Sequence, residues 1–581
     1  MGMEIRLLGK PAIIDAGRQL QPVRGYQAWA LLARVLMSAR PLGRRDMAAE
    51  LFPETVDPLG SLRWCLASLR KALNCAQALC GDPVQSRLPS DTQIDIHRLE
   101  SADFDIESAG ALLEGIAPRC SPAFSTWLLV ERERIASRID ARICQEAQRA
   151  VAVADHERAI RLAQWGALRS PFDEGMHILL VKSLASAGRF DAASDHVLAT
   201  EKMFDIELGE KPSAALRSAA RRTVSSPSLG VSARAMVASL LEYGLAALSA
   251  GAAEAGVDCL RRAVTEAQHC HDAHLQAQAL VELGSALVHS VRGYDNEGAI
   301  VLGQAVESAQ RCGAARIAST GYRELGYVDA LAGRRPTAAK HLAQALELAQ
   351  EPGDLANVHG IMGFNLVDWG KLEEGLAHYQ MSLQLASSVG NRRREGWSLG
   401  LGAWGLLAAG RLDEAEHWLT DCLKLVDELR WTAFRPWPCA VRCESRLRQN
   451  GDPQAIRLEL ESAFALSCQL GDPCWEAAVA RVLGLSHEAA NDTARALEWL
   501  REARKRCVRG TDYYAALLVE ILLDQARLNG KLGHAAQADA CVREALSLAA
   551  RAHMDAHVER AVQLINHAAL STPGMPASSR A

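Results

Sequence analysis

The stretch AGRLDEAEHWLTDCL, Ala409–Leu423, combines a turn with the start of an amphipathic helix. Gly410 can adopt the positive φ that ends a preceding helix. The residues after it place apolar side chains at steps of three and four, on one helix face: Leu412, Ala415, Leu419 and Leu423. One helix pair cannot bury such a stripe alone, so the stretch predicts a unit that stacks on neighbours.

The same turn recurs along most of the chain. Related turns are AGRFDAA at Ala187–Ala193, AGRRPTAA at Ala332–Ala339, WGKLEEGL at Trp369–Leu376 and NGKLGHA at Asn529–Ala535. With weaker copies included, the turn positions lie 37 to 42 residues apart: Gly251, Gly293, Gly333, Gly370, Gly410, Gly451, Asn491 and Gly530. Spacings this regular predict helix–turn–helix repeats stacked into a superhelix.

The repeat pattern resembles tetratricopeptide repeats, with a period longer than the standard of about 34 residues. The resemblance covers residues from about 231 to about 565. It implies a mainly α protein with a C-terminal tetratricopeptide-like superhelix, and we expect this repeat domain at residues 234–570. Long-period repeats of this kind occur in the sensor tails of some large bacterial activators. Small residues are expected where the helices approach closely: Gly363, Gly402 and Ala415. Residues 571–581 are expected to form a disordered tail.

Composition separates the two ends of the chain. The 581 residues are 49% hydrophobic and 23% charged, as in a folded protein of several domains. The net charge is −5, but residues 1–98 hold 13 Lys and Arg against 9 Asp and Glu, which leaves −9 for the rest. A mildly basic head on an acidic body favours a nucleic-acid partner for the head.

Other features of the composition concern location. The sequence contains no apolar run of membrane-spanning length, and its first residues, MGMEIRLLGKPAII, are too polar for a signal peptide, so we expect no secretory leader. Its 15 cysteines are scattered, with no Cys-x-x-Cys motif. We therefore expect a cytoplasmic protein with reduced thiols and no membrane contact.

Residues 3–98 differ from the repeats. Turn residues and periodicity predict two short strands, three helices and a final hairpin: Met3–Leu8, Ala12–Ile14, Tyr26–Met37, Arg44–Phe52, Pro58–Asn74 and Val84–Ile96. Asp57 is the expected N-cap of the third helix, and Pro58 stands in its first turn. This order of elements predicts a winged helix.

The third helix has two different faces. Leucines at steps of three and four predict a buried face: Leu59, Leu62, Leu66, Leu69 and Leu73. The opposite face and its flanks carry polar, basic and aromatic residues: Ser61, Arg63, Trp64, Ser68, Arg70 and Lys71. Such side chains can reach base edges or phosphates. The alternative is a solvated amphipathic helix with Trp64 packed against the following domain.

Three stretches in this region resemble the head of the Streptomyces antibiotic regulatory protein family: MEIRLLGKPAI, WALLARVLMSARPLGRRDMAAELFPE and SLRWCLASLRKALN. Three later segments are similar to the bacterial transcriptional activator domain of that family: WLLVERERI at Trp127–Ile135, Ala159–Ala187 and FDIELGEKPSAAL at Phe204–Leu216. Together these segments extend from residue 3 to about residue 220.

The resemblance implies a domain order and a set of roles. It implies a winged-helix DNA-binding domain at 1–98, an activator domain at 99–220 that contacts RNA polymerase, and a linker at 221–233. The helix Pro58–Asn74 would enter the major groove, Arg44 and Arg45 would lie near phosphates, and Arg87 would lie in the wing. The segment Arg87–Asp91, RLPSD, departs from the Gly-Tyr pair usual in the family's wing. The target sequence does not carry over.

Several kinds of site are not expected. The sequence contains no GxxxxGK[ST], GxSxG, HExxH or EF-hand motif, so we expect neither an enzyme nor a cofactor. Metal-ligand residue types gather at His269, Cys270, His271, Asp272 and His274. Adjacent side chains on a helix point apart, which favours a polar turn there.

Two further groups are more consistent with packing than with a site. Cys439 and Cys443 share a helix face but would need two more ligands to bind a metal, so core packing is expected. An aromatic-rich stretch could line a ligand groove, although such residues more often fill gaps between stacked helices: Trp431, Phe434, Trp437 and Trp475.

The preferred hypothesis is a DNA-binding transcription activator. It would bind DNA as a dimer or a higher assembly, and its repeats would respond to an unknown small molecule or protein. The alternative is a repeat scaffold whose head binds protein. Joint burial of Trp64 and Lys71 would count against DNA binding.

Overall fold

A computed structural model describes the chain except for residues 1–2, 16–17, 20–22, 24, 39–40, 102, 210, 221–232, 250–251, 271, 291–292, 511 and 572–581. The chain divides into two compact units, Met1–Ile143 and Cys144–Ala581, which we call the N-terminal unit and the repeat unit. Apart from Ala233 and Ser571, the expected linker and tail lie outside the described residues. The expected boundaries at 98, 220 and 233 stay predictions.

The N-terminal unit combines a small sheet with helices. Its elements are β1 Glu4–Arg6, β2 Ala12–Asp15, β3 Arg18–Gln19, α1 Tyr26–Met37, α2 Arg44–Leu51, α3 Pro58–Ala72, β4 Gln93–Ile94, α4 Asp95–Arg98, the 3-10 helix Ile106–Ser108 and α5 Pro122–Ala152, which continues into the repeat unit. The strand order is β3-β2-β1-β4. Ile5 of β1 lies opposite Ile13 of antiparallel β2 and beside Ile94 of parallel β4.

The hairpin expected at Val84–Ile96 does not form. Val84 bridges Leu42, Gln85 bridges Cys80, and Gln93–Ile94 instead pairs in parallel with β1. Pro89 has no N–H to donate to a strand ladder, and its carbonyl accepts from the amide of Thr92 in a turn. The chain therefore forms only isolated bridges at Val84 and Gln85 and joins the sheet later, at β4 beside β1.

The N-terminal unit extends well past residue 98 because later segments pack on its helices. The indole of Trp127, on α5, lies 4.6 Å from the guanidinium of Arg34 on α1. The amide of Ser121 donates to the carbonyl of Glu50 at 2.8 Å. Arg132 of α5 donates to the carbonyls of Leu112, Leu113 and Ile116. These contacts attach the first part of α5 to the head.

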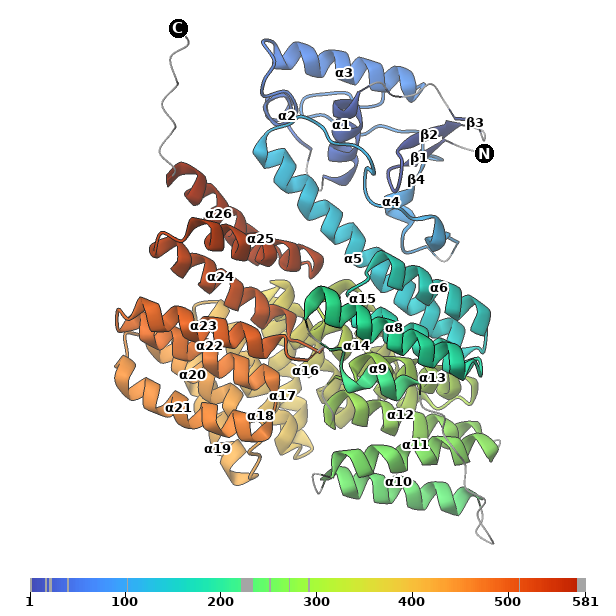
Figure 1. The fold of residues 1–581 in the computed structure, drawn as a ribbon, viewed down its shortest axis with the longest axis vertical. Coiled ribbons are helices and arrows are strands. Elements are labelled where there is room, and N and C mark those ends of the chain that lie inside the picture. Colours follow the sequence, from blue (N-terminus) through green and yellow to red (C-terminus); the bar gives the residue numbers. More distant parts are fainter. Residues whose placement is uncertain are drawn as a thin grey trace. The chain divides into compact units, whose positions relative to one another are not determined.

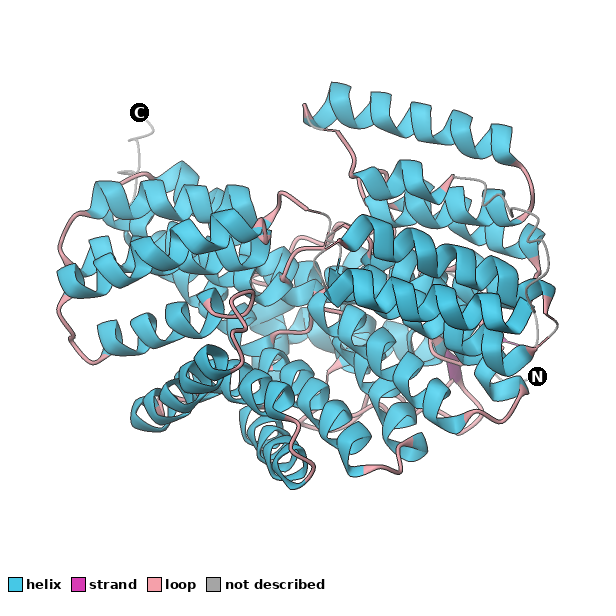
Figure 2. Cartoon of the chain, turned by 90° about the horizontal axis from the view of Figure 1, so that it is seen from below, coloured by secondary structure: helices cyan, strands magenta, loops and turns pink. Residues whose placement is uncertain are grey.

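The repeat unit is built from consecutive helices, most of them joined by short turns (Figures 1 and 2). They are α6 His156–Arg169, α7 Glu174–Ser186, α8 Phe190–Leu208, α9 Ala214–Ala219, α10 Ala233–Ser249, α11 Ala253–His269, α12 Ala273–Ser290, α13 Asp295–Arg311, α14 Ala315–Leu331, α15 Arg335–Leu348, α16 Pro352–Trp369, α17 Leu372–Ser388, α18 Arg392–Ala408, α19 Leu412–Glu428, α20 Pro436–Arg448, α21 Pro453–Leu470, α22 Pro473–Ala489, α23 Thr493–Cys507, α24 Ala515–Lys531, α25 Ala535–Arg551 and α26 Asp555–Ser571. From α10 to α25 each helix packs beside the next. The mainly α, tetratricopeptide-like fold is thereby confirmed.

Most of the expected turn residues have the left-handed backbone that ends a helix. Positive φ values occur at Gly293, Gly333, Gly370, Gly410 and Asn491. Two positions shift: Asn450, with φ 61°, takes the place expected for Gly451, and Gly533, with φ 76°, takes that of Gly530. The second shift arises because α24 continues to Lys531 before it ends. Gly251 lies outside the described residues.

Small residues lie at the closest helix crossings, as predicted. A Cβ on Gly363 of α16 would lie 2.9 Å from the ring of Tyr379 on α17. A Cβ on Gly402 of α18 would lie 2.5 Å from the indole of Trp418 on α19. Ala415 is fully buried. These helices can approach closely only because the side chains at the crossings are small.

The repeat unit also closes on itself, which the repeat pattern did not predict. A carboxylate oxygen of Asp512, in the loop before α24, accepts from the amides of Gly293 and Asp295. The hydroxyl of Tyr514 donates to Asp368 of α16 at 3.0 Å. The loop before α24 is thus bonded to repeats about 150 to 220 residues earlier in the chain.

Candidate nucleic-acid interface

Local sequence determines where α3 begins and which of its faces is buried. The side chain of Asp57 accepts from the amide of Gly60 at 2.8 Å, and Pro58 follows it, as predicted for an N-cap. The inner face buries Leu62, Leu66, Leu69 and Leu73 against the core. Leu59 is instead 41% exposed, because the first turn of α3 extends beyond that core.

The outer face of α3 is open to solvent. Trp64 is 65% exposed, Arg63 and Lys71 are exposed, and Ser61 and Ser68 are half-buried. Trp64 and Lys71 are therefore not buried together. A nucleic acid could reach an aromatic ring, two cationic groups and two hydroxyls along one helix.

Two of the expected DNA-binding arginines are used inside the unit. Arg70 donates to the carbonyl of Ala78 at 3.0 Å and to that of Leu79 at 2.9 Å. Arg44 donates through Nε to the carbonyl of Gly81 at 2.9 Å. Both arginines thus hold the loop that follows α3.

Two further arginines expected to bind DNA, Arg45 and Arg87, do not belong to α3. Arg45 is exposed in the first turn of α2. Arg87 is exposed in the segment between Gln85 and β4, where it donates to Oε1 of Gln85 at 3.3 Å. At the start of α3, Arg63 lies 3.7 Å from Asp57, and both side chains are largely exposed. Such surface pairs contribute little energy.

An open groove of about 630 Å³ lies at the α2–α3 turn, lined by Gln27, Phe52, Thr55, Val56, Asp57, Gly60, Ser61 and Trp64. Val56 is fully exposed beside Trp64. Apolar side chains exposed together are typical of a docking surface for protein. The same turn therefore offers a surface that a protein partner could use.

The residues around Asp272, whose side chains are of kinds that bind metals, lie at a turn between two helices, and Asp272 caps the second helix. A carboxylate oxygen of Asp272 accepts from the amides of His274 and Leu275 at 3.1 Å each. The thiol of Cys270 donates to the carbonyl of Glu266 at 3.2 Å. His271 lies outside the described residues. The described members of this group are arranged as a polar turn.

The aromatic-rich stretch fills space between helices. Trp437 is fully buried and donates through Nε1 to the carbonyl of Gly400 at 3.0 Å. Its ring centroid lies 5.1 Å from that of Trp475. Phe434 is buried and stacks on Trp431 with ring centroids 4.6 Å apart. This geometry fits the packing interpretation of the stretch.

A buried ion network in the repeat unit was not predicted. Arg481 of α22 is 3% exposed, and it lies 2.8 Å from Glu444 of α20 and 2.9 Å from Asp524 of α24. Burial would lower the pKa of Arg481, but the surrounding carboxylates raise it above its usual range. The partners are 37 and 43 residues away, close to one repeat period. A comparison of equivalent positions in successive repeats could have found them.

Comparisons with known proteins gave likenesses in structure alone. No protein-family model matches the chain, and no curated protein matches it. A Rap protein complexed with competence and sporulation factor is 12% identical, with a TM-score of 0.41 over 57% of this chain and 99% of that one. The apo quorum sensor NprR from B. thuringiensis is 14% identical, with a TM-score of 0.39 over 63% and 97%. Mycobacterium tuberculosis EmbR in complex with a low-affinity phosphopeptide is 17% identical, with a TM-score of 0.29 over 38% and 64%. None of these likenesses determines what this chain binds.

Proposed function

We propose that the chain is a sequence-specific, double-stranded-DNA-binding transcription regulator of the Streptomyces antibiotic regulatory protein type. Its winged-helix head binds the major groove through α3. The segment after the head contacts RNA polymerase to activate transcription, and the repeat unit binds a small-molecule or protein effector. The protein acts in the cytoplasm, as a dimer or higher assembly, and requires no covalent chemistry.

The exposed face of α3 carries this proposal. Trp64, Arg63 and Lys71 are accessible together, while the opposite face of the same helix is buried. Arg70 and Arg44 support the helix from behind by holding the loop after it. The sequence resemblance assigns this helix to the major groove. Among the described residues, no helix combines the length and the apolar character needed to cross a membrane.

A repeat scaffold with a protein-binding head is the second candidate. The observation that favours it is the apolar groove beside Val56 and Trp64. A protein partner would cover this groove and leave Lys71, at the other end of α3, in solvent. DNA would instead cover Lys71 together with Trp64.

The test is sequencing of DNA fragments that are retained by the purified full chain. We expect a repeated motif to be enriched, and the double variant Arg63→Ala, Lys71→Ala to lose it. On the enriched site, each lost phosphate contact should reduce the slope of log affinity against log salt by about 1.

A matched control removes two exposed cations from the repeat unit, Arg495→Ala and Lys505→Ala. It changes the net charge of the chain by the same amount and should keep the motif. If both double variants lose the motif equally, the overall charge of the chain, and not the exposed face of α3, accounts for the binding. Absence of any enriched motif with the unaltered chain would contradict DNA binding.

A further inference from the structure

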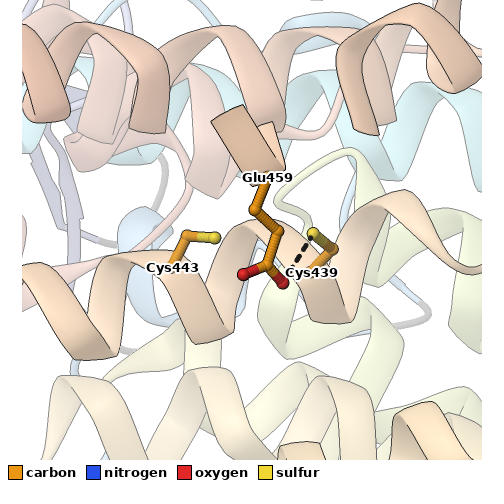
Figure 3. A group of neighbouring side chains, drawn as sticks. All are labelled: Cys439, Cys443 and Glu459. Atoms are coloured by element: carbon orange, nitrogen blue, oxygen red, sulfur yellow. Dashed lines mark hydrogen bonds between the residues drawn. The ribbon is translucent and has the colours of Figure 1, made fainter. Parts of the chain in front are cut away.

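Two cysteines and a glutamate meet between α20 and α21. Cys439 and Cys443 lie one turn apart on α20, and Glu459 comes from α21 (Figure 3). One ligand atom from each residue, two Sγ and a carboxylate oxygen, lie within 4.8 Å of one another. In the part of the chain that the structure describes, no other three His, Cys, Asp or Glu side chains meet this closely.

Both sulfurs face the carboxylate rather than only the apolar core. Figure 3 shows the two thiols on either side of the Glu459 side chain, and the Cys439 thiol donates to its Oε1 at 3.6 Å. Cys439 is 7% exposed and Cys443 is fully buried, whereas the Glu459 side chain is 31% exposed. Glu459 is therefore the member of this group with the most contact with solvent.

Two arginines orient Glu459. Arg442 donates to its Oε1, and Arg446 donates to its Oε2 at 3.3 Å and to Glu416 at 3.0 Å. Each carboxylate oxygen has two lone pairs, so it can accept from an arginine and still bind an ion. Carboxylates that bind metals are commonly held in this way by a second layer of hydrogen bonds.

Charge balance at this position favours a divalent cation. With neutral thiols, the carboxylates of Glu416 and Glu459 are balanced by the guanidiniums of Arg442 and Arg446. If both thiols release their protons to solvent as one divalent ion enters, the cluster remains neutral. The cluster thus avoids the cost of an uncompensated buried charge.

Unused hydrogen-bonding capacity lies beside the cluster. Oε2 of Glu416 and Nε of Arg442 are buried atoms with no hydrogen-bond partner. Buried polar atoms are normally satisfied by protein or by ordered water. Both atoms belong to the side-chain network that holds Glu459, so the cluster has polar groups on this side in addition to its apolar neighbours.

We propose that Cys439, Cys443 and Glu459 bind one thiophilic divalent ion of the Zn²⁺ class, with a water as fourth ligand. Two thiolates and one carboxylate suit Zn²⁺, whereas Mg²⁺ and Ca²⁺ prefer oxygen ligands alone. Tetrahedral Zn²⁺ holds such ligand atoms about 3.5–3.8 Å apart, so the three must move together by only about 1 Å. The ion would join α20 to α21 independently of DNA binding.

The experiment uses the full chain, freed of metal with a chelator and kept reduced, and Co²⁺ as the probe. We expect one Co²⁺ to bind with thiolate-to-cobalt charge-transfer absorption in the near ultraviolet, and Zn²⁺ to displace it. Cys439→Ala and Cys443→Ala should each abolish that absorption. Glu459→Gln keeps both thiols and should weaken Co²⁺ binding at least about 10-fold.

Cys422→Ala is the matched control, because Cys422 is also fully buried but belongs to α19 and donates to the carbonyl of Gly396. It should bind Co²⁺ as the unaltered chain does. Zn²⁺ should raise the unfolding temperature of this control and not that of Cys443→Ala. If the unaltered chain gives no charge-transfer absorption, or if the absorption persists in both cysteine variants or in undiminished strength in Glu459→Gln, the proposal is wrong.

Discussion

Arg70 and Lys71 are neighbours on α3 with different surroundings. Arg70 donates to the carbonyls of Ala78 and Leu79, whose residues are buried, whereas Lys71 is exposed. We expect Arg70→Ala to destabilise the N-terminal unit by about 1–3 kcal/mol, because it removes the arginine donor to the carbonyl of Leu79 and leaves only the Cys80 thiol donating to that of Ala78. Lys71→Ala should change stability by less than about 0.5 kcal/mol. Hydrogen exchange of the α3 amides measures both, and equal effects would contradict the structure.

We expect a histidine pair in the repeat unit to make its stability depend on pH. His177 donates through Nε2 to the carbonyl of Pro171, so its Nδ1 must accept from Nε2 of His196, 3.0 Å away. Burial and the proximity of His177 lower the pKa of His196 to about 4. Because the folded state favours the neutral ring, its stabilisation is present above the unfolded pKa of about 6.5 and is lost as the pH falls toward 4.

The variant His196→Gln isolates this contribution. The glutamine amide can still donate to His177 but does not take up a proton, so unfolding stability should decline less steeply between pH 7 and pH 5. Urea unfolding midpoints at several pH values measure the slope. His417→Gln is the control, because the His417 side chain is 75% exposed. If the slope of stability against pH is unchanged in His196→Gln, the histidine pair does not contribute to the pH dependence of unfolding.

At the scale of elements, we expect two helical glycines, Gly363 and Gly303, to respond in opposite ways to substitution by alanine. Gly363→Ala places a methyl group 2.9 Å from the Tyr379 ring and should destabilise the repeat unit by about 1–3 kcal/mol. Gly303, inside α13, has open space around a Cβ. Gly303→Ala should therefore stabilise by about 0.5–1 kcal/mol through helix propensity. The unfolding temperatures of the two variants test this prediction. Shifts in the same direction would contradict the close approach of α16 and α17 at Gly363.

Elements were predictable where their determinants are local. The bounds Tyr26–Met37 and the start of α3 at Pro58 follow from apolar periodicity and from the Asp57 cap, which operate within one or two turns. The hairpin at Val84–Ile96 was wrong because pairing with β1, about 90 residues earlier, competes with local pairing. Glu459 was missed as a partner of the cysteines because it lies on another helix, 20 residues from Cys439.

At the scale of the repeat unit, the bond from Asp512 to the start of α13 holds distant repeats together. Asp512→Ala removes the acceptor for the amides of Gly293 and Asp295. We expect the backbone at Gly293 and Asp295 to open more easily, by about 1–3 kcal/mol, while α18 and α19 keep their protection. Hydrogen exchange measures this, with Asp421→Ala on the exposed face of α19 as control. Faster exchange throughout the repeats would indicate general destabilisation instead.

The repeat period predicted stacking between neighbours but not this closure. Periodicity reports what each helix buries against the next one, and Asp512 and Tyr514 stand in a loop outside the period. The buried ion pairs of Arg481 were not predicted for a related reason, because charged residues do not contribute to the apolar stripe from which the repeats were identified. Contacts between distant repeats depend on superhelical geometry, which a single repeat does not encode.

The closure also orders events during synthesis. Asp512 follows Asp295 by 217 residues, so at about 5–20 residues per second a ribosome needs roughly 10–40 s to travel from one to the other. During that interval the earlier repeats can already stack, because each needs only its neighbours. A nascent chain therefore passes through a state in which the earlier repeats are stacked while the residues that later bond to them, Asp512 and Tyr514, have not yet been synthesised.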